Sequence, residues 1–161
     1  MTTDTHQGLG MAAAVADQDV VARYLAKIVE VPGSECLYWT GAVSGAGHGR
    51  YWLGAGRVTI AHRFAYALVH GADQLPPLLG HRCDNPLCQR VGPEHVVAST
   101  PSRNRIEWLI RYRIAEGPLA DPRGPRARAQ ALRDLARFDP AAAAADITRI
   151  TQLVSHQPSL F

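Results

Sequence analysis

Apolar residues recur with a helical period near the start of the chain. Asp17 can cap a helix that runs to about Val29, because apolar residues return on one face every three or four positions. This face consists of Val20, Val21, Tyr24, Leu25 and Ile28. Residues 1–16 precede the pattern, and we expect them to be disordered.

Polarity alternates on both sides of a glycine-containing turn within residues 50–60, which predicts a β-hairpin. The alternation puts Arg50 and Trp52 on one face of the hairpin. A short strand is expected upstream over residues 36–40, and a helix is expected over residues 61–70. Four aromatic residues are expected in the core rather than stacked on bases: Trp39, Tyr51, Trp52 and Phe64.

Another helix is predicted to begin at Thr100-Pro101 and to run to about Ala115, because Thr can cap a helix and Pro suits its first position. Asn104 falls on one side of this helix and stays available for chemistry. The other side carries an apolar stripe that we expect to pack against the protein, formed by Ile106, Leu109, Ile110 and Ile114.

The C-terminal part predicts a basic helix over residues 123–137 and an Ala-rich helix after Asp139-Pro140. We expect the arginines of the basic helix to form a solvated face. All these elements together predict an α+β fold. Its parts are the N-terminus over residues 1–16, a central domain over residues 17–115 and a C-terminal helical extension over residues 116–161.

Arginine is concentrated in the middle of the chain. The protein of 161 residues has a net charge of only +3, but residues 50–137 hold fourteen Arg against seven acidic residues. Guanidinium groups bind phosphates in a bidentate geometry, so this excess suggests an anionic partner. A GC-rich genome, whose codons favour Arg over Lys, explains the same excess equally well.

The composition is that of a soluble globular protein, with 47% hydrophobic and 19% charged residues. No run of residues approaches the roughly 20 apolar positions that a membrane span requires. The short apolar run near the N-terminus does not follow a basic region, as it would in a signal peptide. We therefore expect a cytoplasmic protein without a membrane partner.

The three cysteines favour a metal site, because their odd number argues against a disulfide framework. Cys83 and Cys88 flank the turn Asp84-Asn85-Pro86, which lets both thiolates face one point, as tetrahedral zinc requires. His95 can supply a nitrogen ligand, and Cys36 from the upstream strand can complete the set. The loop has little apolar material to bury, so a metal ion would hold it in place.

Several segments resemble the HNH superfamily of endonucleases, and most closely its zinc-binding branch of His-Cys box homing endonucleases and related phage proteins. The resemblance covers about residues 36–113. It implies a ββα-metal core, in which two strands and a helix wrap the active site. The matching segments are Trp39-Thr40-Gly41-Ala42, Gly47-His48-Gly49-Arg50-Tyr51, Ala61-His62-Arg63-Phe64-Ala65-Tyr66 and the block from His81 to Asn104.

The resemblance also implies a role for each matching residue. His81 would be the general base that activates water, and Asn104 would bind Mg²⁺ together with the scissile phosphate. This fits the chemistry, because a neutral imidazole can accept a proton near physiological pH and Mg²⁺ needs few protein ligands. A structural zinc would be held by Cys36, Cys83, Cys88 and His95.

The chain departs from the family at two positions. Gly92-Pro93 stands where relatives usually carry Asn-Pro, so a backbone carbonyl becomes the expected partner that orients His81. Arg103 stands where relatives often carry an acidic residue. Glu107, one turn further along, is then the nearest acidic group on that helix.

DNA contacts are expected from the hairpin and the turn that follows it, through Arg50, Arg57 and Arg63. A two-stranded ribbon fits the major groove, where Arg is the commonest specific reader of guanine. Each of these side chains could instead be solvated or packed locally, and the basic C-terminal helix competes for the same role. His62 is open between packing and a phosphate contact, and no role is assigned to His6, His48, His70 and His156.

The sequence leaves two functions open. The first is a Mg²⁺-dependent endonuclease that acts on double-stranded DNA, of phage, prophage or mobile-element type, as a monomer or a homodimer. The second is a zinc-dependent DNA-binding module whose nuclease centre has decayed. Both require the zinc site, but only the first requires both His81 and Asn104.

Overall fold

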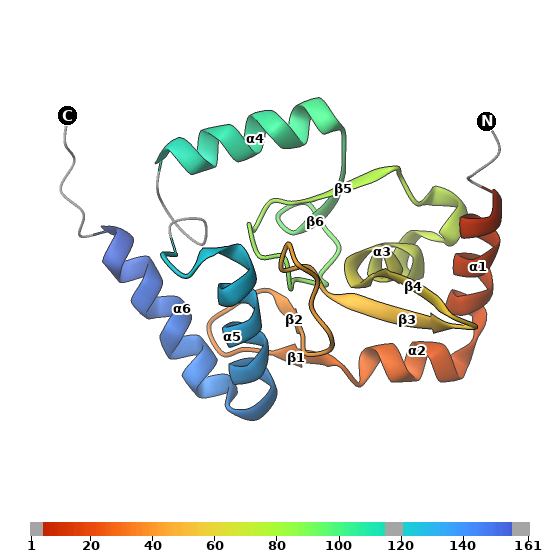
Figure 1. Ribbon diagram of the computed structural model, residues 1–161, viewed down its shortest axis with the longest axis horizontal. Coiled ribbons are helices and arrows are strands. Elements are labelled where there is room, and N and C mark those ends of the chain that lie inside the picture. The colour runs from red at the N-terminus through yellow and green to blue at the C-terminus, as the bar shows by residue number, and fades with distance from the viewer. Residues whose placement is uncertain (1–4, 115–120, 156–161) are drawn as a thin grey trace.

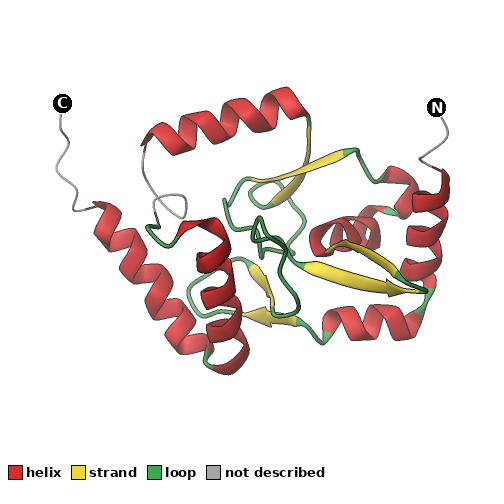
Figure 2. Cartoon of the chain, viewed as in Figure 1, coloured by secondary structure: helices red, strands yellow, loops and turns green. Residues whose placement is uncertain are grey.

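The computed structural model describes residues 5–114 and 121–155 of the chain (Figure 1). It has the expected α+β composition, with helices around three small antiparallel sheets (Figure 2). The elements in chain order are α1 (Thr5–Ala16), α2 (Gln18–Leu25), β1 (Ile28–Glu30), β2 (Leu37–Trp39), β3 (Arg50–Gly54), β4 (Arg57–Ile60), α3 (Ala61–His70), the 3₁₀ turn η1 (Ala72–Gln74), β5 (Leu78–His81), β6 (Val96–Ser99), α4 (Pro101–Ile114), α5 (Gly124–Phe138) and α6 (Pro140–Ser155).

The three sheets are two-stranded pairs, β1–β2, β3–β4 and β5–β6. The β3–β4 pair is the predicted hairpin, with Tyr51 and Leu53 buried on one face. Trp52 was expected in the core, but it lies on the opposite face and is 51% exposed. The guanidinium carbon of Arg23 lies 4.9 Å from the centre of its indole ring and covers part of it.

A cluster of four aromatic rings forms the centre of the core. Their centroids lie 4.8–5.7 Å apart in tilted and edge-on pairs, a favourable geometry for aromatic packing. The hydroxyl of Tyr51 also donates a hydrogen bond to the carbonyl of Val20 in α2. The rings therefore join α2, β2, β3 and α3, and they belong to Tyr24, Trp39, Tyr51 and Phe64.

The N-terminal region differs from the expectation in two ways. Residues 5–16, expected to be disordered, form helix α1, which buries Met11 and Ala14. Helix α2 begins after the predicted cap Asp17 but ends at Leu25 rather than near Val29. Residues 28–30 instead form β1, because they pair with β2.

Helix α4 has the predicted limits, and the hydroxyl of Thr100 caps it by accepting a hydrogen bond from the amide of Arg103 at 3.2 Å. Its apolar stripe does not pack as expected: Ile106 and Ile110 are 56% and 54% exposed, and Leu109 is 38% exposed. The side chain of Ile114, the fourth residue of that stripe, lies outside the described part of the structure. Figure 1 shows α4 running along one edge of the molecule.

Helix α5 packs against β1 and β2 of the central domain, and α6 packs against α5. Ala129, Leu132 and Ala136 of α5 are fully buried and belong to the same core as the aromatic cluster. The expectation of a solvated basic face holds for Arg126, but Arg128 is buried.

None of the helices within residues 5–114 and 121–155 is long and apolar enough to cross a membrane.

We predict that Phe64→Ala lowers the free energy of unfolding by about 3–5 kcal/mol, because it leaves a cavity among the aromatic rings. The matched change Phe138→Ala removes a ring that is 76% exposed, so its cost should stay below about 1 kcal/mol. Urea denaturation of both variants measures the difference. Equal losses of stability would mean that the aromatic cluster is not the centre of the core.

Candidate functional site

A tight turn within the loop between β5 and β6 places two of the predicted metal ligands. The side-chain oxygen of Asn85 accepts a hydrogen bond from the amide of Leu87 at 3.1 Å, and the carbonyl of Asn85 accepts one from the amide of Cys88 at 3.0 Å. Asp84 adopts the left-handed conformation (φ 52°) that such a turn requires. The turn therefore brings Cys83 and Cys88 round to one side.

Strand β2 pairs with this loop and brings the third cysteine. The amide of Trp39 donates to the carbonyl of Leu87 at 3.0 Å, and the amide of Gln89 donates to the carbonyl of Leu37 at 2.8 Å. Tyr38 is the residue opposite Cys88 in this antiparallel pairing, and Cys36, which directly precedes β2, is thereby brought close to Cys88.

The structure brings all four predicted ligands into one cluster. The ligand atoms of Cys36, Cys83, Cys88 and His95 all lie within 4.8 Å of one another. Nδ1 of His95 lies 3.8 Å from Sγ of Cys36 and 3.6 Å from Sγ of Cys88. Tetrahedral zinc with usual bond lengths needs separations of about 3.5 Å between nitrogen and sulfur. The cluster can therefore bind a metal ion such as zinc.

The surroundings of the cluster favour a thiolate at Cys36, whereas the neighbouring sulfurs and burial raise the pKa of Cys83 and Cys88. Side-chain hydrogen bonds from Cys83 and Cys88 lower the pKa of Cys36. Nε2 of His95, the nitrogen that faces away from the sulfurs, lies 3.8 Å from a carboxylate oxygen of Glu35. This distance is too long for a hydrogen bond, so Glu35 is an exposed charge near His95 rather than a fixed partner of its ring.

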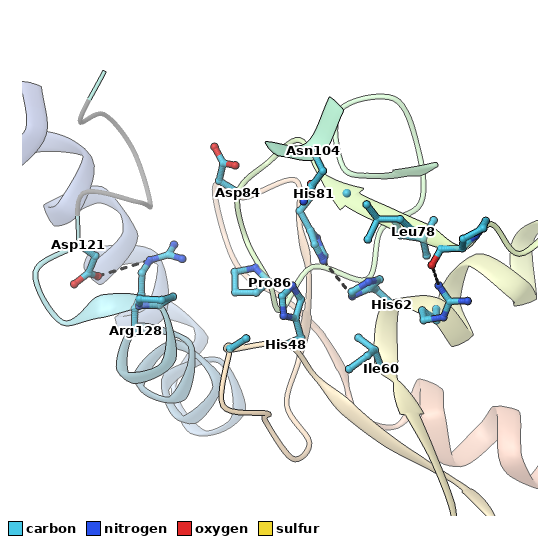
Figure 3. A pocket seen from close by; sticks show the side chains of 16 residues that line it. His48, Ile60, His62, Leu78, His81, Asp84, Pro86, Asn104, Asp121 and Arg128 are labelled. Atoms are coloured by element: carbon cyan, nitrogen blue, oxygen red, sulfur yellow. Dashed lines mark hydrogen bonds and ion pairs between the residues drawn. The ribbon is translucent and has the colours of Figure 1, made fainter. Parts of the chain in front are cut away.

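A pocket of about 590 Å³ opens beside the metal cluster (Figure 3). It contains both residues that the family resemblance implies for catalysis, His81 and Asn104. Residues from β4, α3, β5, α4, α5 and four loops line it. They are Ala46, His48, Ile60, His62, Arg63, Pro77, Leu78, Leu79, Gly80, His81, Asp84, Pro86, Asn104, Asp121, Pro125 and Arg128.

Three imidazoles meet in this pocket. Nε2 of His81 lies 3.1 Å from Nδ1 of His62, so the partner of His81 is a side chain rather than the expected backbone carbonyl. The ring of His48 lies 5.6 Å from that of His81 and 5.4 Å from that of His62, between centroids. Burial lowers the pKa of all three, and together with His48 it lowers the pKa of His81 to about 3.

The other ring nitrogen of His81, Nδ1, is buried and makes no hydrogen bond with any described residue. If Nδ1 is unprotonated, Nε2–H donates to Nδ1 of His62, and this tautomer leaves a lone pair on Nδ1 of His81.

Asn104 reaches the pocket from the first turn of α4. Its side-chain oxygen would lie 3.4 Å from a Cβ atom placed on Gly80, the residue before His81. Asn104 therefore lies over a glycine, and Figure 3 shows it next to His81.

The three arginines predicted to contact DNA occupy different places. Arg50 is exposed at the end of β3 that pairs with Ile60, a pocket residue. Arg57 lies at the far end of the hairpin, where its guanidinium covers Gly10 of α1. Arg63 lines the pocket and donates to the carbonyls of Pro76 and Pro77 at 3.1 Å.

Helix α5 and the turn before it close the pocket with charged groups. Asp121 has a side chain that is 1% exposed, and Arg123 pairs with it at 2.6 Å. Burial alone would raise the pKa of Asp121, but hydrogen bonds from Arg123 lower it, so it remains a carboxylate. Burial also lowers the pKa of Arg128, whose side chain is only 8% exposed.

Over 83 residues, the chain is 32% identical to protein 7.7 of Escherichia phage T7. The matched region is 52% of the chain and 62% of the phage protein, so the chain spans less than two thirds of that relative. No family model matches the chain, and no solved structure matches it either. The expected phage character agrees with this similarity.

The sequence did not indicate the pocket positions of His48 and Arg128. His48 was given no role, although its segment was part of the family resemblance, and only the fold brings it next to His62. Arg128 was assigned to a solvated helix face. Its neighbours at the buried positions Ala129 and Leu132 were a signal that one side of this helix packs inward.

We predict that His95→Ala lowers the metal content of the purified protein from one ion per chain to a small fraction, because a ligand of the cluster is lost. The exposed His70 is a matched control, and His70→Ala should keep the full content. Elemental analysis of protein purified without chelators measures both. Wild-type protein without metal would contradict the assignment of the cluster.

Proposed function

We propose that this protein is a metal-dependent DNA endonuclease of the HNH type. The observation that carries the proposal is the placement of His81 and Asn104 in one pocket beside the cluster of three cysteines and one histidine. His81 is the last residue of β5, and Asn104 lies in the first turn of α4.

The order of elements around the pocket supports a ββα-metal core. Strand β5 ends at His81, and the loop with Cys83, Cys88 and His95 follows. Strand β6 then pairs with β5, and α4 begins two residues after β6 ends. This order of two strands and a helix is compatible with the core that the family resemblance implies. The β5–β6 pair carries His81, the proposed base, and α4 carries Asn104, the proposed Mg²⁺ ligand.

The cluster of Cys36, Cys83, Cys88 and His95 holds a structural zinc in this proposal. Four protein ligands fill a tetrahedral site, so no position is open for water or substrate. The ion therefore stabilises the loop and does not take part in hydrolysis. Because His81 stands two residues before Cys83, the same ion also keeps the base in place.

His81 acts as the general base through Nδ1. The water oxygen forms a bond to phosphorus, its proton moves to Nδ1 of His81, and the bond from phosphorus to the 3′ oxygen breaks. His62 positions the base, because its Nδ1 accepts the Nε2–H of His81. A bound phosphate carries negative charge, which raises the pKa of His81 from its low value toward the range of an effective base.

Asn104 would hold the catalytic Mg²⁺. Its amide oxygen and the side chain of Asp84 both line the pocket, and oxygen atoms are the ligands that Mg²⁺ prefers. When bound, such an ion neutralises charge on the phosphate and on the leaving oxygen. Asn104 therefore provides the site for the cation, while His81 moves the proton.

Double-stranded DNA is the proposed substrate, contacted through Arg50, Arg57 and Arg63. Arg50 is the strongest of the three candidates, because its pairing partner Ile60 lines the pocket. Arg57 is three residues from Ile60 along β4, or about 10 Å in an extended strand. It would therefore contact the duplex further from the cleaved bond.

A DNA-binding module without nuclease activity is the second candidate. One observation favours it: Glu107, the acidic residue nearest to Asn104 on α4, is paired with Arg103 at 2.9 Å. Within the described part of α4, Asn104 has no acidic neighbour free to share a cation. Binding without cleavage would identify this function.

We predict that the wild-type protein cleaves plasmid DNA in the presence of Mg²⁺ or Mn²⁺. His81→Ala should lower the rate by about 10²- to 10⁴-fold, because the general base is removed. Asn104→Ala should also reduce it strongly. A nicking assay on supercoiled plasmid measures these rates.

The matched control for His81→Ala is His70→Ala, which removes an exposed imidazole from α3 and should leave cleavage unchanged. Metal content should be the same in all variants. Full activity in His81→Ala would assign the base to another residue, and a wild type that binds DNA without cutting it would favour the second candidate.

We predict that Arg50→Ala weakens duplex binding and reduces its salt dependence by about one unit of slope, because one phosphate contact is lost. Arg57→Ala should weaken binding less. Arg137→Ala, an exposed change on α5, is the control. Fluorescence anisotropy over a salt series measures all three, and unchanged binding in both hairpin variants would remove the hairpin from the interface.

A further inference from the structure

Arg128 is a buried cation that faces the pocket. It lies on α5 with only 6% of its surface exposed, and it lines the same pocket as His81 and Asn104. Figure 3 shows it across the pocket from His81 and His62, with His48 and Pro86 between them. A guanidinium is rarely buried without full pairing, so its partners decide what it does here.

The position of Arg128 is held by the packing of α5. The neighbouring Ala129 is fully buried in the core. Gly47, next to His48, lies so close to α5 that a Cβ atom there would stand 2.9 Å from the carbonyl oxygen of Pro125 and 3.2 Å from Cβ of Ala129. The loop that carries His48 is therefore packed directly on α5, and Arg128 is held beside the imidazoles.

The guanidinium of Arg128 lacks a hydrogen-bond acceptor among the described residues of the chain. Its Nε lies 3.7 Å from a carboxylate oxygen of Asp121, which is too long for a hydrogen bond. That carboxylate already accepts hydrogen bonds from Arg123 at 2.6, 2.9 and 3.1 Å. Among the described residues, no group accepts a hydrogen bond from the five N–H donors of Arg128.

The salt-bridge network of Arg128 has an excess of positive charge, and the pocket also holds the carboxylate of Asp84 on the loop after β5. Asp121 and Asp146 pair with Arg123, Arg128 and Arg149, so three cations share two carboxylates and leave a net charge of +1. Burial lowers the pKa of His48 and His62 across the pocket, so these two imidazoles add no positive charge at neutral pH. A buried positive charge with free donors favours an anion with several acceptor oxygens.

We infer that Arg128 binds a phosphate group of the DNA backbone in this pocket. The inference rests on the proposed function and adds a substrate-binding residue to it. Its planar guanidinium can donate two parallel hydrogen bonds to phosphate oxygens while His81 faces the same group from the other side. Helix α5 is then a wall of the active site and not an appendage to the nuclease domain.

Arg128→Met tests this inference, because Met keeps the volume and the buried stem but removes the charge and the donors. The carboxylate of Asp121 keeps its pair with Arg123 at 2.6 Å in this variant, so the change leaves no buried carboxylate unpaired. The matched control is Arg126→Met, an exposed change on the same helix. Binding of a short fluorescent duplex is measured by anisotropy without divalent cations, over a salt series.

We expect Arg128→Met to raise the Kd for the duplex by about 10- to 100-fold, because the phosphate loses a charged hydrogen-bonding partner. The slope of log K against log salt should fall by about one, since one phosphate contact disappears. Arg126→Met should change neither by much. Equal behaviour of the two variants overturns the inference.

A second measurement uses the wild-type protein alone, in case Arg128→Met does not fold. Inorganic phosphate is titrated while the guanidinium Nε–H signal of Arg128 is followed by NMR. A saturable shift supports the inference, and a signal that does not respond overturns it.

Measuring DNA cleavage beside duplex binding distinguishes a failure of this inference from a failure of the proposed function. If the wild type binds duplex through Arg128 but never cuts it, the nuclease proposal fails and the phosphate site stands. If the wild type cuts DNA and Arg128→Met binds and cuts equally well, the nuclease proposal stands and the phosphate site fails. A wild type that does not bind duplex at all overturns both.

Discussion

The pairing of β2 with the cysteine-rich loop is the contact on which the site depends. Two backbone hydrogen bonds, from Trp39 to Leu87 and from Gln89 to Leu37, join segments about fifty residues apart in the chain. They set Cys36 against Cys88 and seat the loop on the aromatic core through the fully buried Leu87. His81 is the last residue of β5, and the cysteine-rich loop follows it directly. The same contact therefore also helps to position His81 in the pocket.

The pocket combines two kinds of wall with opposite electrostatic character. On one side, burial keeps the imidazoles of His48, His62 and His81 neutral. On the other side, the salt-bridged turn before α5 holds the cation Arg128 in place through a network with Asp121. The pocket therefore places neutral imidazoles on one wall and a buried positive charge on the other.

Helix α4 differs from the other elements in how it is held. It begins directly after β6, is capped by Thr100 and carries Asn104 over Gly80, so its first turn is well positioned. Beyond that turn, Ile106 and Ile110 remain exposed. The apolar period of a helix predicts which face is apolar, but whether that face is covered depends on neighbours that the period does not describe.

The sequence by itself determined most of the local structure and the ligands of the metal cluster. Turn chemistry at Asp84-Asn85-Pro86, the hairpin over residues 50–60 and the limits of α3, α4 and α5 follow from short-range preferences, and these are encoded within a few residues. The types and spacing of Cys83, Cys88 and His95 likewise indicated a metal site with sulfur and nitrogen ligands.

Tertiary structure alone decided what surrounds those ligands. Residues 28–30 became a strand because β2 offers them a partner, against their helical pattern. His48, His62 and Arg128 come from three elements far apart in the chain, and nothing in their own neighbourhoods indicates that they meet. Local preferences act over one or two turns, whereas a pocket is made by contacts between distant segments, so only the packed fold could place these three side chains around His81.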